Sequence, residues 1–143
     1  MRAHAVMTID VTHVTPETTL KKAYALMRKL DVRHLPVLHD QRLVGLVSDR
    51  DVLVRSTRKR GRVTVGAGRV RRVMSRVTLT MGPTASVSEL AHLMIEEKID
   101  AVPIVDSGRK LVGLVTSTDL LKLLTDAVRP KDRLPFSFTL RQP

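Results

Sequence analysis

The sequence predicts an α+β protein in which two β-α-β-β-α repeats pack sheet to sheet with pseudo-twofold symmetry. Two observations lead to this prediction. The chain of 143 residues contains one ordered set of short motifs twice. Each copy also combines helical spacing of apolar residues with short apolar runs of strand length. One copy alone would leave a sheet face bare, whereas two packed copies cover it and form two equivalent clefts between them.

The repeat is visible at an offset of 67 residues. The matching positions are Val6-Met7 with Val73-Met74, Pro16 with Pro83, Leu26-Met27 with Leu93-Met94, and Pro36 with Pro103. The pentapeptide Leu-Val-Gly-Leu-Val then occurs at 43–47 and at 111–115, an offset of 68, because the turn at 106–108 carries one inserted residue. An ordered series of matches with one insertion indicates an internal repeat.

Each copy opens with a proline turn and a helix. In the second copy, Ser86 and Glu89 have the spacing of a capping box. In the first copy, Thr19 is expected to cap the helix, and Lys22 stands in the place of the glutamate. The apolar positions expected to face the core are Leu20, Ala23, Tyr24, Met27 and Leu30 in the first copy and Val87, Leu90, Ala91 and Met94 in the second.

Two strands and a second helix complete each copy. We expect strands at 35–38, 43–47, 102–105 and 111–115, followed by helices that begin at Ser48 and Thr116. The Leu-Val-Gly-Leu-Val strand is apolar on both faces, as is typical of a strand that is covered on both sides. The predicted organisation is repeat 1 at 1–56, a basic linker at 57–72, repeat 2 at 73–126 and a C-terminal tail at 127–143.

Composition narrows the classes of function. The chain has no cysteine, which excludes a disulfide framework and a thiolate metal site and fits a cytoplasmic location. No apolar run approaches the roughly 20 residues of a membrane span, so we expect no membrane partner. The five histidines lack zinc-ligand spacing and no catalytic set stands out, so we expect no metal site, no required cofactor and no enzymatic activity. The net charge of +11 predicts an anionic partner.

The residues that carry chemistry lie where the second strand of each copy meets the second helix. Ser48 and Asp51 in the first copy, and Thr116 and Asp119 in the second, have the three-residue spacing of a capping box. The same hydroxyl can donate to a phosphate at the helix N-terminus, and the same carboxylate can accept both hydroxyls of a ribose. A ligand can recruit a capping pair, so both interpretations stay open.

The whole repeated pattern, Val-Met, Pro, Leu-Met, x-Pro and Leu-Val-Gly-h-h-Ser/Thr-x-x-Asp (h for apolar), resembles the cystathionine β-synthase (CBS) domain. Two such domains in tandem resemble a Bateman module. The resemblance implies a regulatory module without catalytic turnover that senses AMP, ADP or ATP, with AMP and ATP foremost, or an adenosyl ligand such as S-adenosylmethionine. It also implies a homodimer and a regulated protein partner that the sequence does not identify.

The resemblance also assigns the site residues. Asp51 and Asp119 are implied to hold ribose, and Ser48 and Thr116 to contact phosphate or ribose. The backbone around the x-Pro strands, at 33–36 and 100–103, is implied to contact the adenine edge. The expected ligand-binding residues are Arg33, His34, Leu35, Pro36, Ser48, Arg50, Asp51, Ala101, Val102, Pro103, Thr116 and Asp119.

The two copies differ in charge around the motif. Arg50 stands beside Asp51 as a natural phosphate partner, whereas the second copy has Thr118. Before its proline the first copy has Arg33-His34, where the second has Asp100-Ala101. Because an acidic residue repels phosphate, we expect a phosphorylated ligand in the Asp51 cleft and leave the Asp119 cleft open.

A second hypothesis comes from a different class of protein. Residues 58–62, Arg-Lys-Arg-Gly-Arg, are also typical of a basic scaffold or a nucleic-acid-associated protein that acts through its linker while its clefts stay empty. Without aromatic residues for stacking, such binding would depend on the phosphate backbone and on salt. A rise in melting temperature with ligand favours the first hypothesis, and co-purifying nucleic acid favours the second.

Overall fold

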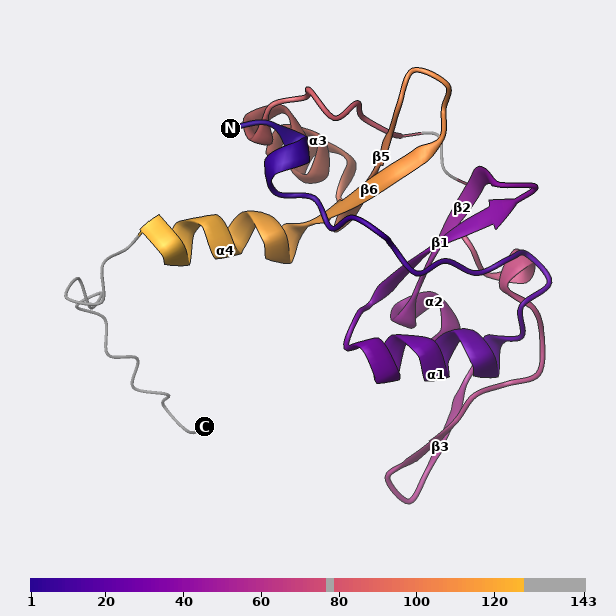
Figure 1. The fold of residues 1–143 in the computed structure, drawn as a ribbon. Coiled ribbons are helices and arrows are strands. Elements are labelled where there is room, and N and C mark those ends of the chain that lie inside the picture. The colour runs from indigo at the N-terminus through magenta and orange to yellow at the C-terminus, as the bar shows by residue number, and fades with distance from the viewer. Residues whose placement is uncertain (77–78, 128–143) are drawn as a thin grey trace, which may run out of the picture.

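The computed structural model describes residues 1–76 and 79–127 (Figure 1). The first repeat contains α1 (Leu20–Leu30), β1 (His34–His39), β2 (Arg42–Ser48) and α2 (Asp49–Leu53). The second contains α3 (Val87–Glu97), β5 (Ala101–Val105), β6 (Leu111–Thr116) and α4 (Ser117–Ala127). The 3-10 turn η1 (Ala3–Ala5) precedes them, and β3 (Thr57–Lys59), β4 (Arg62–Thr64) and the turn η2 (Val70–Arg72) lie between them. The predicted α+β class and its two repeats are confirmed; the predicted tail, beyond Ala127, lies outside the described residues.

An antiparallel strand pair forms the centre of each repeat. Strand β1 pairs with β2, and β5 pairs with β6. The strand that precedes each first helix is reduced to one bridged residue, because Val14 pairs in parallel with Val37 and Met81 pairs in parallel with Ile104. The order β-α-β-β-α is therefore present in both repeats, with a first strand of minimal length.

The segments that enter the two repeats cross between them. Thr8 forms a bridge with Leu114 of β6, although the sequence assigns Thr8 to the first repeat, and Ser75 forms a bridge with Leu46 of β2. The first segment then continues to the sheet of the first repeat, where Val14 pairs with Val37. The second continues to the sheet of the second repeat, where Met81 pairs with Ile104. The two repeats are thus joined by exchanged edge segments as well as by the covalent chain.

The hydrophobic cores show the same exchange, because each repeat buries one residue from the segment that enters the other repeat. Ala3, in η1, is fully buried in the core of the second repeat, and Val70, in η2, is fully buried in the core of the first. The sequence places Val70 in a linker. The structure differs because a helix packed on a short strand pair leaves apolar surface uncovered, and burying an apolar side chain there is favourable.

The helix signals of the sequence are confirmed. The Thr19 side chain accepts a hydrogen bond from the Lys22 backbone N–H, and Ser86 and Glu89 form a reciprocal capping box. Leu20, Ala23, Met27, Leu90 and Met94 are buried as expected, and Tyr24, Val87 and Ala91 are partly buried. The expectation for Leu30 is wrong. As the last residue of α1 it extends past the core, and its side chain is 41% exposed.

The remaining part of the predicted linker is a hairpin. Strands β3 and β4 pair with each other and with no other strand, so they form a separate two-stranded sheet that projects beyond α1 (Figure 1). Across the described ranges, no helix is long and apolar enough to cross a membrane.

Candidate functional site

Two clefts lie between the repeats, and they have equivalent parts. Cleft 1, of about 230 Å³, contains the Ser48–Asp51 motif and the residues that enter β5 of the other repeat. Cleft 2, of about 400 Å³, contains the Thr116–Asp119 motif and the residues that enter β1. Cleft 2 falls within the range of roughly 300–1,000 Å³ that is typical of small-molecule sites, and cleft 1 is smaller.

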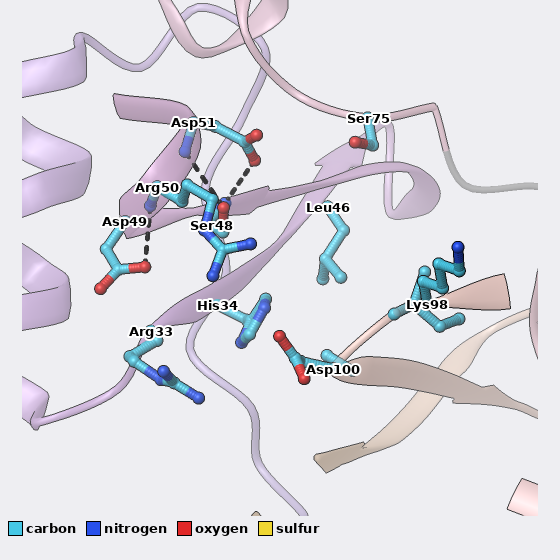
Figure 2. A pocket seen from close by; sticks show the side chains of 12 residues that line it. Arg33, His34, Leu46, Ser48, Asp49, Arg50, Asp51, Ser75, Lys98 and Asp100 are labelled. Carbon is cyan, nitrogen blue, oxygen red and sulfur yellow. Dashed lines mark hydrogen bonds between the residues drawn. The ribbon is translucent and has the colours of Figure 1, made fainter. Parts of the chain in front are cut away.

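In cleft 1 the motif forms a complete capping box at the start of α2 (Figure 2). The Ser48 backbone N–H donates to Asp51 Oδ2 at 2.8 Å, and the Asp51 backbone N–H donates to Ser48 Oγ at 3.1 Å. Asp51 is only partly buried. Within residues 1–76 and 79–127, no protein group donates to its second oxygen, Oδ1. Asp51, which lines cleft 1, therefore caps the helix with one oxygen and keeps the other available as an acceptor.

In cleft 2 the equivalent pair forms three hydrogen bonds. The Thr116 backbone N–H and hydroxyl both donate to Asp119 Oδ2, at 2.8 and 2.7 Å, and the Asp119 backbone N–H donates to Thr116 Oγ1 at 3.3 Å. Lys122 Nζ lies 4.0 Å from Asp119 Oδ1. The second motif thus holds its hydroxyl on its own carboxylate and has a lysine beside the remaining oxygen.

Arg33 and His34 line both clefts. They lie at the start of β1, between the two motifs, where His34 is opposite Ser48 in the strand register. Burial lowers the pKa of His34 below its ordinary value, and the adjacent Arg33 guanidinium lowers it further, while Asp100, Asp49 and Asp51 act in the opposite direction. Burial and Arg33 thus favour the neutral form of this imidazole, which lies on the wall that the clefts share.

The structure rearranges the charges expected around the two clefts. Asp100 and Ala101 line cleft 1 with Asp51, not cleft 2 with Asp119. Figure 2 shows Arg33, Arg50 and His34 on one side of cleft 1, and Asp100 and Lys98 on the other. The charged residues of cleft 1 are Arg33, Arg50, Lys98, Asp49, Asp51 and Asp100, and those of cleft 2 are Arg33, Lys122, Asp10, Asp31 and Asp119. Cleft 1 has three cations against three carboxylates, and cleft 2 has two against three.

Other predicted site residues divide between the clefts and the core. Leu35 lines cleft 2. Pro36, Val102 and Pro103 are buried in their strands and are absent from the described walls of either cleft. The x-Pro strands thus contribute through the residues just before the proline, His34 and Leu35 in the first repeat and Ala101 in the second.

The sequence interpretation missed several residues that line the clefts, including one pair related by the repeat. Asp31 and Lys98 are 67 positions apart, and each ends the first helix of its repeat in a left-handed conformation, with φ of 52° and 55°. Asp31 lines cleft 2 and Lys98 lines cleft 1. The repeat offset is the signal that relates them, whereas neither lies in a recognisable motif. Among the described residues, no group of three His, Cys, Asp or Glu side chains is placed to hold a metal ion.

The curated proteins similar to this chain include a CBS domain-containing protein and longer enzymes. The chain is 36% identical over 114 residues to the CBS domain-containing protein YhcV of Bacillus subtilis, an alignment covering 80% of this chain and 79% of YhcV. It is 33% identical over 119 residues to the inosine-5'-monophosphate dehydrogenase of Korarchaeum cryptofilum, covering 83% of this chain. The chain spans only 23% of the length of that enzyme.

Solved structures share the fold. CBSX2 in complex with AMP has a TM-score of 0.75 and 25% identity, covering 90% of this chain and 99% of that chain; CBSX2 is a CBS-pair protein from Arabidopsis thaliana. The CBS domain pair of protein MJ0100, in complex with 5'-methylthioadenosine and S-adenosyl-L-methionine, has a TM-score of 0.76 and 22% identity, covering 90% of this chain and 98% of that chain.

The family model of the CBS domain matches the chain twice, at residues 3–57 and 70–126. Each match starts at the turn, η1 or η2, whose first residue, Ala3 or Val70, is buried in the core of the other repeat. The chain therefore belongs to the CBS domain family and carries the domain as a tandem pair.

Proposed function

We propose that the chain is a non-catalytic regulatory module that binds an adenine nucleotide, or another adenosyl ligand, in the clefts between its repeats. The observation that carries the proposal is the capping carboxylate of cleft 1. Asp51 lines the cleft, caps α2 through Oδ2, and keeps a second acceptor, Oδ1, to which no described protein group donates. A carboxylate oxygen in this position can accept the hydroxyls of a ribose, the role that an acidic residue has in dinucleotide folds.

The similarity to CBSX2, which binds AMP, supports adenine as the base. Cleft 1 also offers an apolar surface for a ring, because Leu46 and Ile99 line it from opposite repeats. Small-molecule sites typically combine such apolar walls with a few well-placed polar groups. The ligand panel to test therefore consists of AMP, ADP, ATP and S-adenosylmethionine.

We place the phosphorylated ligand in cleft 1. Three cations, Arg33, Arg50 and Lys98, surround the cleft there. Three carboxylates, Asp49, Asp51 and Asp100, also line cleft 1, so its lining has no net charge, whereas the lining of cleft 2 has a net charge of −1. Guanidinium groups bind phosphate through paired hydrogen bonds. Cleft 2, with fewer cations, is suited to a ligand of lower negative charge.

Ligand-dependent stabilisation is the direct test. Ligand at 100 times its dissociation constant raises the free energy of unfolding by about 2.7 kcal/mol, a shift of several degrees in melting temperature for a chain of this size. Thermal denaturation with each member of the panel at millimolar concentration measures it. If no member shifts the melting temperature, the proposal is wrong.

The variant Asp51→Asn separates binding from capping. Asparagine preserves a hydrogen-bond acceptor, so the loss of stability should stay within about 1 kcal/mol. Loss of a charged acceptor should lower the affinity roughly tenfold or more, measured by titration calorimetry with Asp119→Asn as the matched variant in cleft 2. Arg50→Ala should lower the affinity for ATP more than the affinity for adenosine. Should Asp51→Asn lose stability but keep its affinity, Asp51 is a helix cap only.

We further propose that the module works as a homodimer and transmits ligand binding to a regulated protein. The support for a dimer is that α4 has no buried residue, and that Leu121 and Leu124 are 60% and 64% exposed. Support for a regulated partner comes from the dehydrogenase relative, in which the matching region is a minor part of a longer enzyme.

A further inference from the structure

The charge of the chain is concentrated in one uninterrupted stretch. Residues 52–88 contain nine arginines and lysines and no aspartate or glutamate. Two of these cations, Arg69 and Arg71, lie outside the hairpin and share one carboxylate, because both form ion pairs with Glu17. Four others, Arg58, Lys59, Arg60 and Arg62, belong to the β3–β4 hairpin at 57–64. Among the described residues, no carboxylate lies within ion-pair distance of these four side chains.

The hairpin contributes nothing to either core. Every residue of β3 and β4 is exposed. The hairpin is attached through its two ends: Ser56 Oγ donates to the Val52 carbonyl at 3.0 Å, and Val65 packs against the core of the first repeat. A two-stranded ribbon without a buried face has little stability of its own, so packing gives no reason for its sequence.

Strand pairing distributes the cations over the whole ribbon. Lys59 pairs with Arg62, and Arg58 pairs with Val63. Paired residues share a face, and neighbouring residues lie on opposite faces, so both faces carry cations. Arg60 and Gly61 form the tip, with φ of 47° and 76°. Asparagine is the favoured first residue of such a turn, yet this chain has an arginine there, which extends the charge to the end of the ribbon.

We propose that the β3–β4 hairpin is a binding surface for the phosphate backbone of double-stranded DNA. The major groove of B-form DNA admits a two-stranded β-ribbon, and a ribbon with cations on both faces and its tip can contact the phosphates on both sides of the groove. Three of the four cations are arginines, which bind phosphate in a bidentate way. This inference is independent of the proposed nucleotide clefts.

The composition of the hairpin disfavours other anionic partners. Protein interfaces depend on buried aromatic and aliphatic anchors, and membrane-surface segments combine cations with apolar side chains that insert into lipid. The hairpin has one apolar side chain, Val63, which is 38% exposed, and no aromatic residue. The proposal assigns the four cations to phosphates, which carry no sequence information, so binding should be independent of sequence.

The test compares two variants that each remove two positive charges from a hairpin turn. Arg60→Gln with Arg62→Gln alters the proposed surface, and Arg109→Gln with Lys110→Gln alters the exposed turn between β5 and β6. Fluorescence anisotropy measures binding of a labelled DNA duplex of about 20 base pairs, two helical turns, over a range of salt concentrations. Four phosphate contacts predict a slope of log K against log salt of about −3.6, four times −0.9.

The hairpin variant should reduce that slope by about 1.8 and weaken binding roughly tenfold at moderate salt, whereas the control variant should stay within about twofold. Unchanged melting temperatures confirm that both variants fold, and an unchanged stabilisation by AMP separates this surface from the clefts. Equal losses in both variants would mean that only net charge matters, and would overturn the proposal. Equal competition by polyglutamate, anionic lipid vesicles, single-stranded DNA or duplex RNA would also overturn it.

Discussion

The side chain of Met7 packs on Gly113 of strand β6, so closely that a Cβ atom added to Gly113 would lie 2.5 Å from Met7 Sδ. Met74 packs in the same way on Gly45 of strand β2, where an added Cβ would lie 2.8 Å from Met74 Sδ. The repeated Val-Met and Leu-Val-Gly-Leu-Val motifs therefore touch each other, but across the two repeats. Each position has a glycine because a larger side chain would collide with the methionine of the segment that enters the other repeat.

The two glycines should differ in their tolerance of alanine. At Gly45 an added Cβ also meets the Ser75 carbonyl oxygen at 2.8 Å, and that oxygen accepts the Leu46 N–H in the bridge between the repeats. At Gly113 the close atoms all belong to the flexible Met7 side chain. We expect Gly45→Ala to lower the free energy of unfolding by about 1–3 kcal/mol and Gly113→Ala by less.

Urea denaturation measures both changes in the free energy of unfolding. Gly82→Ala is the matched control, because an added Cβ there meets no atom within 4 Å. If Gly45→Ala and Gly113→Ala have equal effects, the backbone contact at Ser75 is not what limits position 45.

Arg33 should couple the two clefts. Its guanidinium lines both of them, and one guanidinium cannot pair fully with two phosphates at once. If the proposed nucleotide sites exist, Arg33→Ala should lower the affinity of each cleft roughly tenfold, the loss of one charged hydrogen bond. Titration calorimetry of Arg33→Ala in the Asp51→Asn and Asp119→Asn backgrounds isolates each cleft in turn.

The exposed Lys29 of α1 provides the control for this measurement, since Lys29→Ala removes the same charge outside the clefts. If Arg33→Ala lowers the affinity in only one of the two variants, Asp51→Asn or Asp119→Asn, then Arg33 contacts the ligand of only one cleft.

The titration of His34 should make stability and binding respond to pH in opposite directions. The folded protein lowers the pKa of His34 from 6.5, chiefly through burial. Between that lowered value and 6.5 the unfolded chain binds more protons, so the free energy of unfolding falls as the pH is lowered through this window. A bound phosphate favours the imidazolium, so nucleotide affinity should rise over the same window.

Melting temperature and affinity measured at pH about 7.5 and about 5.5, on either side of the ordinary histidine pKa, give both slopes. His34→Gln should reduce both of them, whereas the exposed His13 gives the control variant His13→Gln. If the pH dependence persists in His34→Gln, another group is responsible.

The sequence carries enough local information to predict the elements but not their partners across the chain. The Ser86–Glu89 capping box and the buried Met27 and Met94 follow from spacing alone, because helical periodicity and capping are local properties. The burial of Ala3 and Val70 in exchanged cores does not follow, because a repeat offset relates equivalent positions without saying which copy each segment joins.

The same limit applies to the clefts. The motif residues Ser48, Asp51, Thr116 and Asp119 were predictable because hydroxyl and carboxylate stand at a fixed local spacing, and the structure places each pair at a cleft. The position of Asp100 in the same cleft as Asp51 was not predictable, since it depends on how the second repeat is rotated against the first. The charges of each cleft come from both repeats, so they cannot be predicted from the motif of one repeat alone.

The exposed face of α4 should form the interface between two copies of the chain. Leu121 and Leu124 are three residues apart and so lie on one face of the helix, and no residue of α4 is buried in the chain. Burying an exposed leucine stabilises an interface by about 1.5–3 kcal/mol. The wild-type protein at micromolar concentration should therefore scatter light as a particle of about 32 kDa, twice the chain mass of 16.0 kDa.

The double variant Leu121→Glu with Leu124→Glu should scatter as a single chain, because two charges would be buried without partners in the dimer. It should keep a folded core, since both side chains are already exposed within one chain. Ile9→Glu places a charge on another exposed apolar residue, 62% accessible and outside the helices, and should remain dimeric. A wild-type particle of 16.0 kDa, or a double variant that still dimerises, would show that α4 is not the interface.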